Sequence, residues 1–152
     1  TNQIVNKLIE AQTTLAIAES CTGGYISNMI TNISGASKIF NSGIICYSNE
    51  AKIQILNVNP KIIEKYGAVS ELVAQQLAMN IRILSNSKIG VSTTGIAGPT
   101  GATIEKPIGL VYIGFSSEED TIVEKHQIFA DRIRFKELVF EIVLNHLEKL
   151  IS

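Results

Sequence analysis

Three short polar segments hold the side chains with which this chain could perform chemistry. They are residues 19–24, 47–52 and 94–101. The first contains two possible nucleophiles, Ser20 and Cys21, and either one needs a neighbouring base or a lowered pKa to react. None of the three segments contains a histidine, because His126 and His146 are the only histidines and both come later. A base for Ser20 or Cys21 must therefore be another residue type.

Lys52 is the candidate base. Ser48 and Asn49 both offer capping side chains, and with Asn49 as the N-cap Lys52 falls at the third position of the helix that follows, where the positive end of the helix dipole disfavours the ammonium form. Burial would lower the lysine pKa further, and a lysine general base must be neutral. The alternative is a solvated lysine on an exposed helix face, which is the commoner situation. The residue pattern leaves both open.

The first segment could also bind a ligand through its backbone. It leads into a helix, whose unpaired N–H groups and dipole can hold an anion or an oxyanion, and Gly23 and Gly24 allow close approach. It matches neither GxxxxGK[ST] nor GxGxxG, so it is not a known nucleotide-phosphate loop. The alternative is an N-cap, Ser20 or Thr22, followed by an ordinary turn.

The remaining candidates are weaker by themselves. Thr93, Thr94 and Gly95 could orient a water molecule or an amide, or could simply begin an ordered surface loop. Arg132 and Lys136 lie one turn apart at the start of the last helix and could clamp a phosphate, or could be solvated cations.

The hydrophobic pattern predicts the elements that position these residues. Strands are expected at 14–18, 40–47, 88–94, 108–115 and 121–129, and helices at 4–12, from 25, at 50–56, from Pro60, at 71–84 with Ser70 as N-cap, and at 132–150. The inner side of helix 71–84 is expected to carry Leu72, Val73, Leu77 and Ile81. Helices between strands favour a layered α/β domain, and the late hairpin implies a mixed sheet. Because each polar segment follows a strand, and ligands bind beyond the carboxyl ends of strands in such sheets, the three segments are expected to line one pocket.

Composition limits the possible partners. The chain has 152 residues, 45% of them hydrophobic and 18% charged, with a formal net charge of -1. This composition is typical of one globular domain over residues 1–152, and it lacks the basic excess that binds nucleic acid. The two cysteines fit neither a disulfide framework nor a metal motif, and no apolar run reaches the roughly 18 to 20 residues of a membrane span. We expect a cytoplasmic protein with small-molecule partners and no metal, cofactor, nucleic acid or membrane.

Five motifs in series resemble one family. They are Ala18-Glu19-Ser20-Cys21-Thr22-Gly23-Gly24, Tyr47-Ser48-Asn49-Glu50-Ala51-Lys52, Gly67-Ala68-Val69-Ser70, Thr94-Gly95-Ile96-Ala97-Gly98-Pro99 and Lys106-Pro107-Ile108-Gly109. In this order and spacing they resemble the C-terminal domain of the competence-damage-inducible protein (CinA) family, whose free-standing members are nicotinamide-nucleotide amidohydrolases. The resemblance covers nearly the whole chain and implies a single three-layer α/β/α domain with a mixed β-sheet. Many relatives carry a further N-terminal domain associated with pyrophosphatase activity, and only the deamidase part is expected here.

The resemblance also implies a reaction and residue roles. Ser20 would be the nucleophile, Lys52 its base and Thr94 an assisting hydroxyl, without a metal or cofactor. The substrate would be nicotinamide mononucleotide, hydrolysed to nicotinate mononucleotide and ammonia in pyridine-nucleotide recycling, and the protein would be a homo-oligomer. Residues expected to bind the substrate are Glu19, Cys21, Thr22, Gly23, Gly24, Tyr47, Asn49, Gly95 and Arg132.

One departure and two alternatives accompany this prediction. Relatives usually have two arginines near the start of the last helix, whereas this chain has Arg132 and Lys136, and lysine lacks the bidentate fork that arginine offers a phosphate. One alternative is a non-catalytic nucleotide-binding module in which Lys52 stays protonated. The other is a cysteine amidase that uses Cys21, with a thiol pKa lowered at the helix N-terminus.

Overall fold

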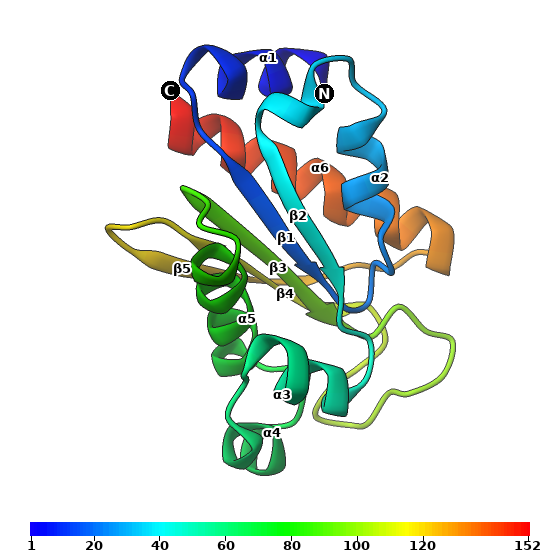
Figure 1. Cartoon of the computed structure of the whole chain (residues 1–152). Helices are drawn as coiled ribbons and strands as arrows, with labels where there is room; N and C mark the ends of the chain where they lie inside the picture. The colour runs from blue at the N-terminus through cyan, green and yellow to red at the C-terminus, as the bar shows by residue number, and fades with distance from the viewer.

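The computed structural model describes residues 1–152 and contains one five-stranded sheet with six α-helices and a short 3-10 helix (Figure 1). The strands are β1 (Leu15–Glu19), β2 (Phe40–Ile45), β3 (Ile89–Gly95), β4 (Leu110–Ser116) and β5 (Thr121–Gln127). The helices are α1 (Asn2–Glu10), α2 (Tyr25–Thr31), η1 (Ala36–Lys38), α3 (Asn49–Leu56), α4 (Pro60–Tyr66), α5 (Glu71–Leu84) and α6 (Arg132–Ile151). Every predicted helix and strand is present, with ends that differ by a few residues.

The sheet is mixed, as the late hairpin predicted. Its strand order is β2-β1-β3-β4-β5. Strand β1 pairs in parallel with both β2 and β3, whereas β4 runs antiparallel to β3 and to β5. Each parallel pair needs a crossover, which the chain makes through helices, while the acidic turn at 117–120 is short enough to join only antiparallel strands.

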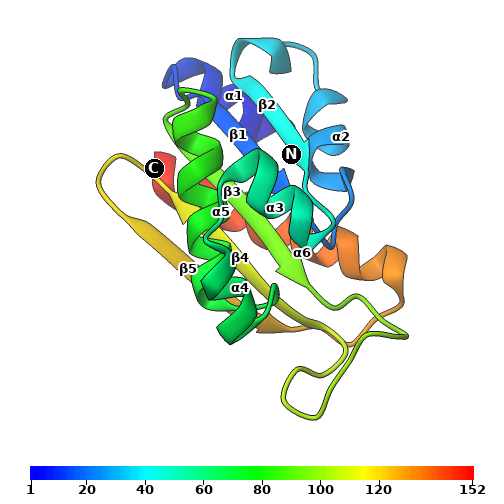
Figure 2. The same ribbon diagram turned by 60° about the horizontal axis from the view of Figure 1, so that its bottom comes forward.

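Helices cover both faces of the sheet and give the three layers that were expected. Helices α1, α2 and α6 lie on one face and α3, α4 and α5 on the other (Figures 1 and 2). Leu8, Ile26 and Phe135 belong to the larger buried cluster, under the first group. Leu56 and Leu77 belong to the smaller cluster, under the second. Strand β1 is buried at all five positions because helices cover both of its faces.

Helix α5 confirms the predicted N-cap and corrects one core residue. The Ser70 hydroxyl accepts a hydrogen bond from the backbone N–H of Val73, as an N-cap does. Val73, Leu77 and Ile81 are buried, but Leu72 is 38% exposed, so its predicted place in the core was wrong. Val73, Leu77 and Ile81 recur every four positions and therefore lie on one side of the helix. Leu72 directly precedes Val73, so its side chain points about 100° away from that buried side.

The carboxyl ends of β1, β2 and β3 meet at one edge of the sheet, because these three strands are adjacent and parallel. The segments that follow β1 and β2 and the one at the end of β3 are those singled out by their polar residues. The structure therefore brings the three segments together.

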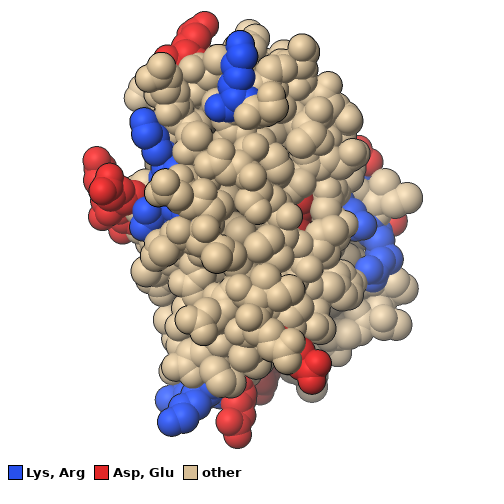
Figure 3. Space-filling view, in the orientation of Figure 1, with Lys and Arg blue, Asp and Glu red and all other residues tan.

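The surface matches the low net charge. On the face shown in Figure 3, lysine and arginine side chains form small separate groups toward the margins and no continuous basic stripe. None of the helices combines the length and the hydrophobicity that a bilayer crossing requires.

Candidate active site

The side chains of Ser20 and Lys52 meet beyond the end of β1. Ser20 directly follows this strand, and its Oγ lies 2.9 Å from Nζ of Lys52, on the facing helix α3. Ser20 is 7% exposed and Lys52 only 1%. A hydroxyl in contact with a buried amine has the geometry of a nucleophile with its base.

Helix α3, which carries Lys52, begins one residue earlier than the sequence indicated. The N-cap is Ser48, whose Oγ accepts a hydrogen bond from the N–H of Ala51, so the prediction that Asn49 caps this helix was wrong. Helical side chains tilt toward the N-terminus of their helix. Nζ of Lys52 accordingly folds back over the first turn and lies 2.8 Å from the carbonyl oxygen of Cys46 and 3.1 Å from that of Tyr47.

The surroundings of Lys52 make its neutral form easier to reach than in a solvated lysine. Burial lowers the pKa of Lys52 below its ordinary value of 10.5. No carboxylate lies within ion-pair distance of Nζ to hold the ammonium form. A neutral amine has two N–H donors and one lone pair. It can donate to the carbonyls of Cys46 and Tyr47 and accept the Ser20 proton, which satisfies its three shortest contacts.

Glu19, which was expected to bind substrate, faces the protein interior. Its side chain is fully buried. One carboxylate oxygen accepts hydrogen bonds from Thr22 Oγ1 and the N–H groups of Gly24 and Ile26, and the other from N–H and Oγ of Ser27. The expectation of a substrate contact is therefore corrected for Glu19, which holds the turn and the start of α2. The same applies to Thr22, which is also fully buried.

The two threonines at the end of β3 point to opposite faces, because side chains alternate along a strand. Thr93 Oγ1 lies 2.8 Å from Thr22 Oγ1 and 3.4 Å from the backbone nitrogen of Ser20. Thr94 Oγ1 donates to the carbonyl of Ala68 at 2.9 Å. Thr93 thus ties the turn at residues 20–24, called the nucleophile turn below because it holds the candidate nucleophile Ser20, to the sheet. Because side chains alternate along a strand, the sequence already indicated that Thr93 and Thr94 point to opposite faces. Only the pairing of Thr93 with Glu19 in the parallel sheet shows that Thr93 is the one that faces the turn.

Four residues that were expected at the site line one pocket beside Ser20. The pocket has a volume of about 280 Å³ and is lined by Cys21, Tyr47, Gly95, Ile96, Ala97, Gly98, Thr100, Gly101 and Arg132. Arg132 Nη1 donates to the carbonyl of Gly98, and Nη2 lies 3.4 Å from the Tyr47 hydroxyl. The start of α6 is thereby fixed against the loop that follows β3.

The other expected residues lie around this pocket. Gly23 and Gly24 have φ of 61° and 99°, the left-handed region that glycine adopts without strain, so the sharp turn requires them. A methyl group added at Gly23 would lie 3.6 Å from Nζ of Lys136, which places that cation next to the turn. Asn49 is exposed at the start of α3 and makes no side-chain hydrogen bond. A larger cavity of about 730 Å³ lies at the opposite end of the sheet and contains none of the expected residues.

The environment of Cys21 opposes a thiolate. Burial raises the pKa of Cys21 to about 12, against the smaller opposing effect of a hydrogen bond with Thr93. This corrects the argument that the helix N-terminus would lower the thiol pKa, since the loss of solvation is the larger effect. The structure gives Cys21 no basic partner comparable to the Lys52 amine at Ser20.

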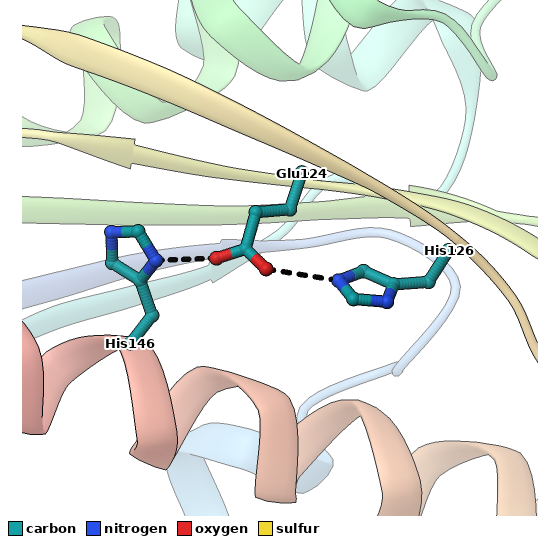
Figure 4. Close-up of polar contacts among 3 residues, drawn as sticks. All are labelled: Glu124, His126 and His146. Atoms are coloured by element: carbon teal, nitrogen blue, oxygen red, sulfur yellow. Dashed lines mark hydrogen bonds and ion pairs between the residues drawn. The ribbon is translucent and has the colours of Figure 1, made fainter.

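Both histidines lie away from this site. His126 on β5 and His146 on α6 contact the two carboxylate oxygens of Glu124, which lies between them (Figure 4). His146 also stacks on Phe115, with ring centroids 3.8 Å apart. The cluster joins the last helix to the edge of the sheet. No group of three or more histidine, cysteine or acidic side chains is arranged to hold a metal ion.

A family model and curated sequences match this chain. The CinA C-terminal domain model matches residues 1–151. A protein of Thermoanaerobacter sp. strain X514, provisionally named competence-damage inducible protein, is 51% identical over 135 residues, covering 88% of this chain and 33% of the relative. A similarly named protein of Caldanaerobacter subterraneus subsp. tengcongensis is 48% identical over 151 residues, covering 96% and 37%. The chain thus spans about a third of the length of these relatives.

Solved structures share the whole fold. The competence/damage inducible protein CihA from Agrobacterium tumefaciens superposes with a TM-score of 0.95 at 30% identity, covering 99% of this chain and 92% of that one. A competence-damaged protein (CinA) superfamily protein from Escherichia coli gives a TM-score of 0.93 at 27% identity, covering 98% and 87%.

Proposed function

This chain belongs to the CinA C-terminal domain family, and on that premise we propose that it is a serine amidohydrolase that deamidates nicotinamide mononucleotide without a metal. The observation that carries the proposal is the 2.9 Å contact between Ser20 Oγ and Lys52 Nζ, with the lysine buried and free of carboxylate partners. A module that only binds nucleotides has no use for a hydroxyl held against a buried amine.

The reaction begins with a proton transfer. Neutral Lys52 takes the proton of Ser20 while Oγ attacks the carboxamide carbon and forms a tetrahedral oxyanion. The intermediate collapses as its C–N bond breaks, and the Lys52 ammonium returns the proton to the departing nitrogen as ammonia. Water, deprotonated by the same amine, then attacks the Ser20 ester, and the Lys52 ammonium returns this proton to Ser20 Oγ as the C–O bond breaks and nicotinate mononucleotide leaves. Each half-reaction returns Lys52 to the neutral state.

The pocket rim suits the rest of the substrate. Tyr47 is 60% exposed and offers an aromatic face to a cationic pyridine ring. Arg132 and Lys136, one turn apart on α6, have no carboxylate within ion-pair distance. Both cations remain available for a phosphate, so we place the nucleotide phosphate between α6 and the Gly23 turn.

The proposal also covers the Thr94 hydroxyl and the assembly of the protein. The Thr94 hydroxyl would assist proton transfer only by exchanging its hydrogen bond to Ala68 for one to substrate or water. A homo-oligomer remains the proposed assembly. Exposed apolar side chains on the strand-end loop and before and within α6 support it, namely Ile104, Phe129 and Ile133.

The test is ammonia release from nicotinamide mononucleotide by the wild type, Ser20→Ala and Lys52→Ala, with a chelator present throughout. We expect activity in the wild type and a fall of about 10⁴-fold or more in both folded variants, because a nucleophile and its base act as a unit. Wild-type protein that binds the nucleotide but releases no ammonia would instead identify a binding module. Loss of wild-type activity on adding chelator would contradict the metal-free mechanism.

A further inference from the structure

The hydrogen bonds of the nucleophile turn leave two backbone amides without a partner. The N–H of Ser20 donates to the carbonyl of Thr93, that of Gly23 to Ser20, and that of Tyr25 to Thr22. Those of Gly24, Ile26 and Ser27 all donate to the carboxylate of Glu19. The N–H groups of Cys21 and Thr22 donate to no acceptor in another residue. Unpaired N–H groups are rare in protein interiors, so this pair calls for an explanation.

Only one of the two amides belongs to a residue that a ligand can reach. Thr22 is fully buried, whereas Cys21 is 6% exposed and lines the pocket beside Ser20. Cys21 also directly follows the nucleophile. When Ser20 attacks a carbonyl carbon, the N–H of the next residue is well placed to meet the oxygen on which negative charge develops.

Glu19 determines which amides remain free. Its carboxylate takes up three N–H groups at the start of α2, so the end of this helix already holds an anion that belongs to the protein. Of the N–H groups of residues 21–24, which were expected to hold an oxyanion, those of Gly23 and Gly24 are thus taken up within the protein. Thr22 Oγ1 links the Glu19 carboxylate to Thr93 Oγ1, which contacts the nitrogen of Ser20. The conformation on both sides of Cys21 is therefore fixed by buried hydrogen bonds.

We propose that the backbone N–H of Cys21 stabilises the oxyanion of the Ser20 reaction and that Glu19 is the positioning residue that holds it there. This inference rests on the proposed amidohydrolase function. It assigns a role in the reaction to the backbone of the turn and not to its side chains. Cys21 contributes its amide and not its thiol. Glu19 acts on the reaction only through the backbone.

A covalent adduct tests the amide assignment. The 3-aldehyde analogue of nicotinamide mononucleotide would add to Ser20 Oγ as a hemiacetal, whose oxygen occupies the oxyanion position. In ¹⁵N-labelled protein, we expect the amide proton of Cys21 to move downfield by more than any other amide of residues 20–27. An adduct that instead shifts Gly23 or Gly24 most would overturn this inference and leave the amidohydrolase proposal standing. Failure to form any adduct, seen as the absence of a hemiacetal carbon signal from the ¹³C-labelled aldehyde bound to the native protein, would overturn both.

Variants test the positioning role of Glu19. In Glu19→Gln an NH₂ group replaces one carboxylate oxygen. On the side of Ser27 this group would face the backbone N–H of Ser27, which can only donate a hydrogen bond. We expect a fall in kcat of at least about tenfold, toward the 10²-fold or more that removal of an oxyanion donor costs, with KM nearly unchanged. Affinity for the aldehyde analogue should fall by the same factor as kcat/KM, whereas affinity for nicotinate mononucleotide should not.

Ser27→Ala is the matched milder variant, since it removes one hydroxyl donor and leaves the other four bonds to Glu19. We expect it to fold if Glu19→Gln does not, and to show a smaller effect of the same pattern. A parallel loss of product affinity and kcat in either variant would show that Glu19 only supports the fold and would overturn the positioning role. Unchanged kcat in both variants would do the same.

Discussion

Nζ of Lys52 lies 2.8 Å from the carbonyl oxygen of Cys46, six residues earlier in the chain, so this side chain runs backward over the first turn of its own helix. Nζ also lies 3.1 Å from the carbonyl oxygen of Tyr47, 3.5 Å from that of Ser48 and 2.9 Å from Ser20 Oγ. A buried amine with three carbonyl neighbours and one hydroxyl neighbour has a defined orientation in both protonation states. The protonation of Lys52 is therefore the property on which several measurable effects depend.

The pH dependence of the reaction should report this amine. Because burial lowers the pKa of Lys52, and only the neutral amine accepts the Ser20 proton, kcat/KM should rise with pH through a single ionisation with its midpoint below 10.5. Steady-state ammonia release from pH 5 to 10 measures it. A midpoint at or above 10.5 would contradict the assignment of Lys52 as base.

Protein stability should show the same ionisation. Between the lowered pKa of folded Lys52 and the ordinary 10.5, the unfolded chain binds more protons than the folded one. The free energy of unfolding should therefore rise with pH across this window. Lys52→Met should remove the rise, whereas Lys61→Met, which removes an exposed lysine, should keep it. Urea denaturation at a series of pH values measures these free energies. The same pH dependence in both variants would contradict the assignment of this ionisation to Lys52.

Cys21→Ala should retain activity within a few-fold of wild type. The raised pKa of Cys21, about 12, leaves almost no thiolate at neutral pH, and the backbone amide survives the substitution. Ammonia release and thiol titration of the variant measure the outcome. A loss of several orders of magnitude would revive the cysteine mechanism.

The two cations of α6 should act on the phosphate. Arg132→Ala and Lys136→Ala should each raise KM for nicotinamide mononucleotide, by roughly tenfold for a lost charged hydrogen bond, and should leave KM for the riboside, which lacks the phosphate, nearly unchanged. Lys136→Arg should lower KM for the nucleotide by restoring the bidentate fork. Arg134→Ala is the matched control, because Arg134 pairs with Glu137 on the same helix. Equal effects on nucleotide and riboside would place the phosphate elsewhere.

Glu124→Gln should lower stability without affecting catalysis. Burial alone would raise the pKa of Glu124, but hydrogen bonds with His126 and His146 outweigh it and hold the pKa below its usual 4.5. The carboxylate is 31% exposed, so we expect a loss of about 1 kcal/mol at neutral pH. The loss should shrink as pH falls through the lowered pKa, because the protonated wild type then resembles the variant. Thermal unfolding at pH 3 and pH 7 measures the difference, and an equal loss at both would contradict it.

The sequence by itself determined the elements and the edge of the sheet where the candidate site lies. Apolar periodicity and caps such as Ser70 are local properties, and the expectation that the polar segments share one pocket needed only that each of them follows a predicted strand. The family resemblance ranked Ser20 and Lys52 above their alternatives, and the structure places the two side chains in contact. These inferences succeeded because each depends on neighbours in the chain or on a shared pattern.

Tertiary structure alone decided which polar groups are buried and what they contact. Distant segments decide whether Glu19 faces the pocket or the core and which threonine of β3 faces the turn. They also decide whether burial, which raises the pKa of the Cys21 thiol, outweighs the helix end, which would lower it. Leu72 illustrates the same limit, since only the packing of α5 against the sheet fixes which side of the helix is covered. Burial and long-range hydrogen bonds set the energies of charged groups, and neither is a property of local sequence.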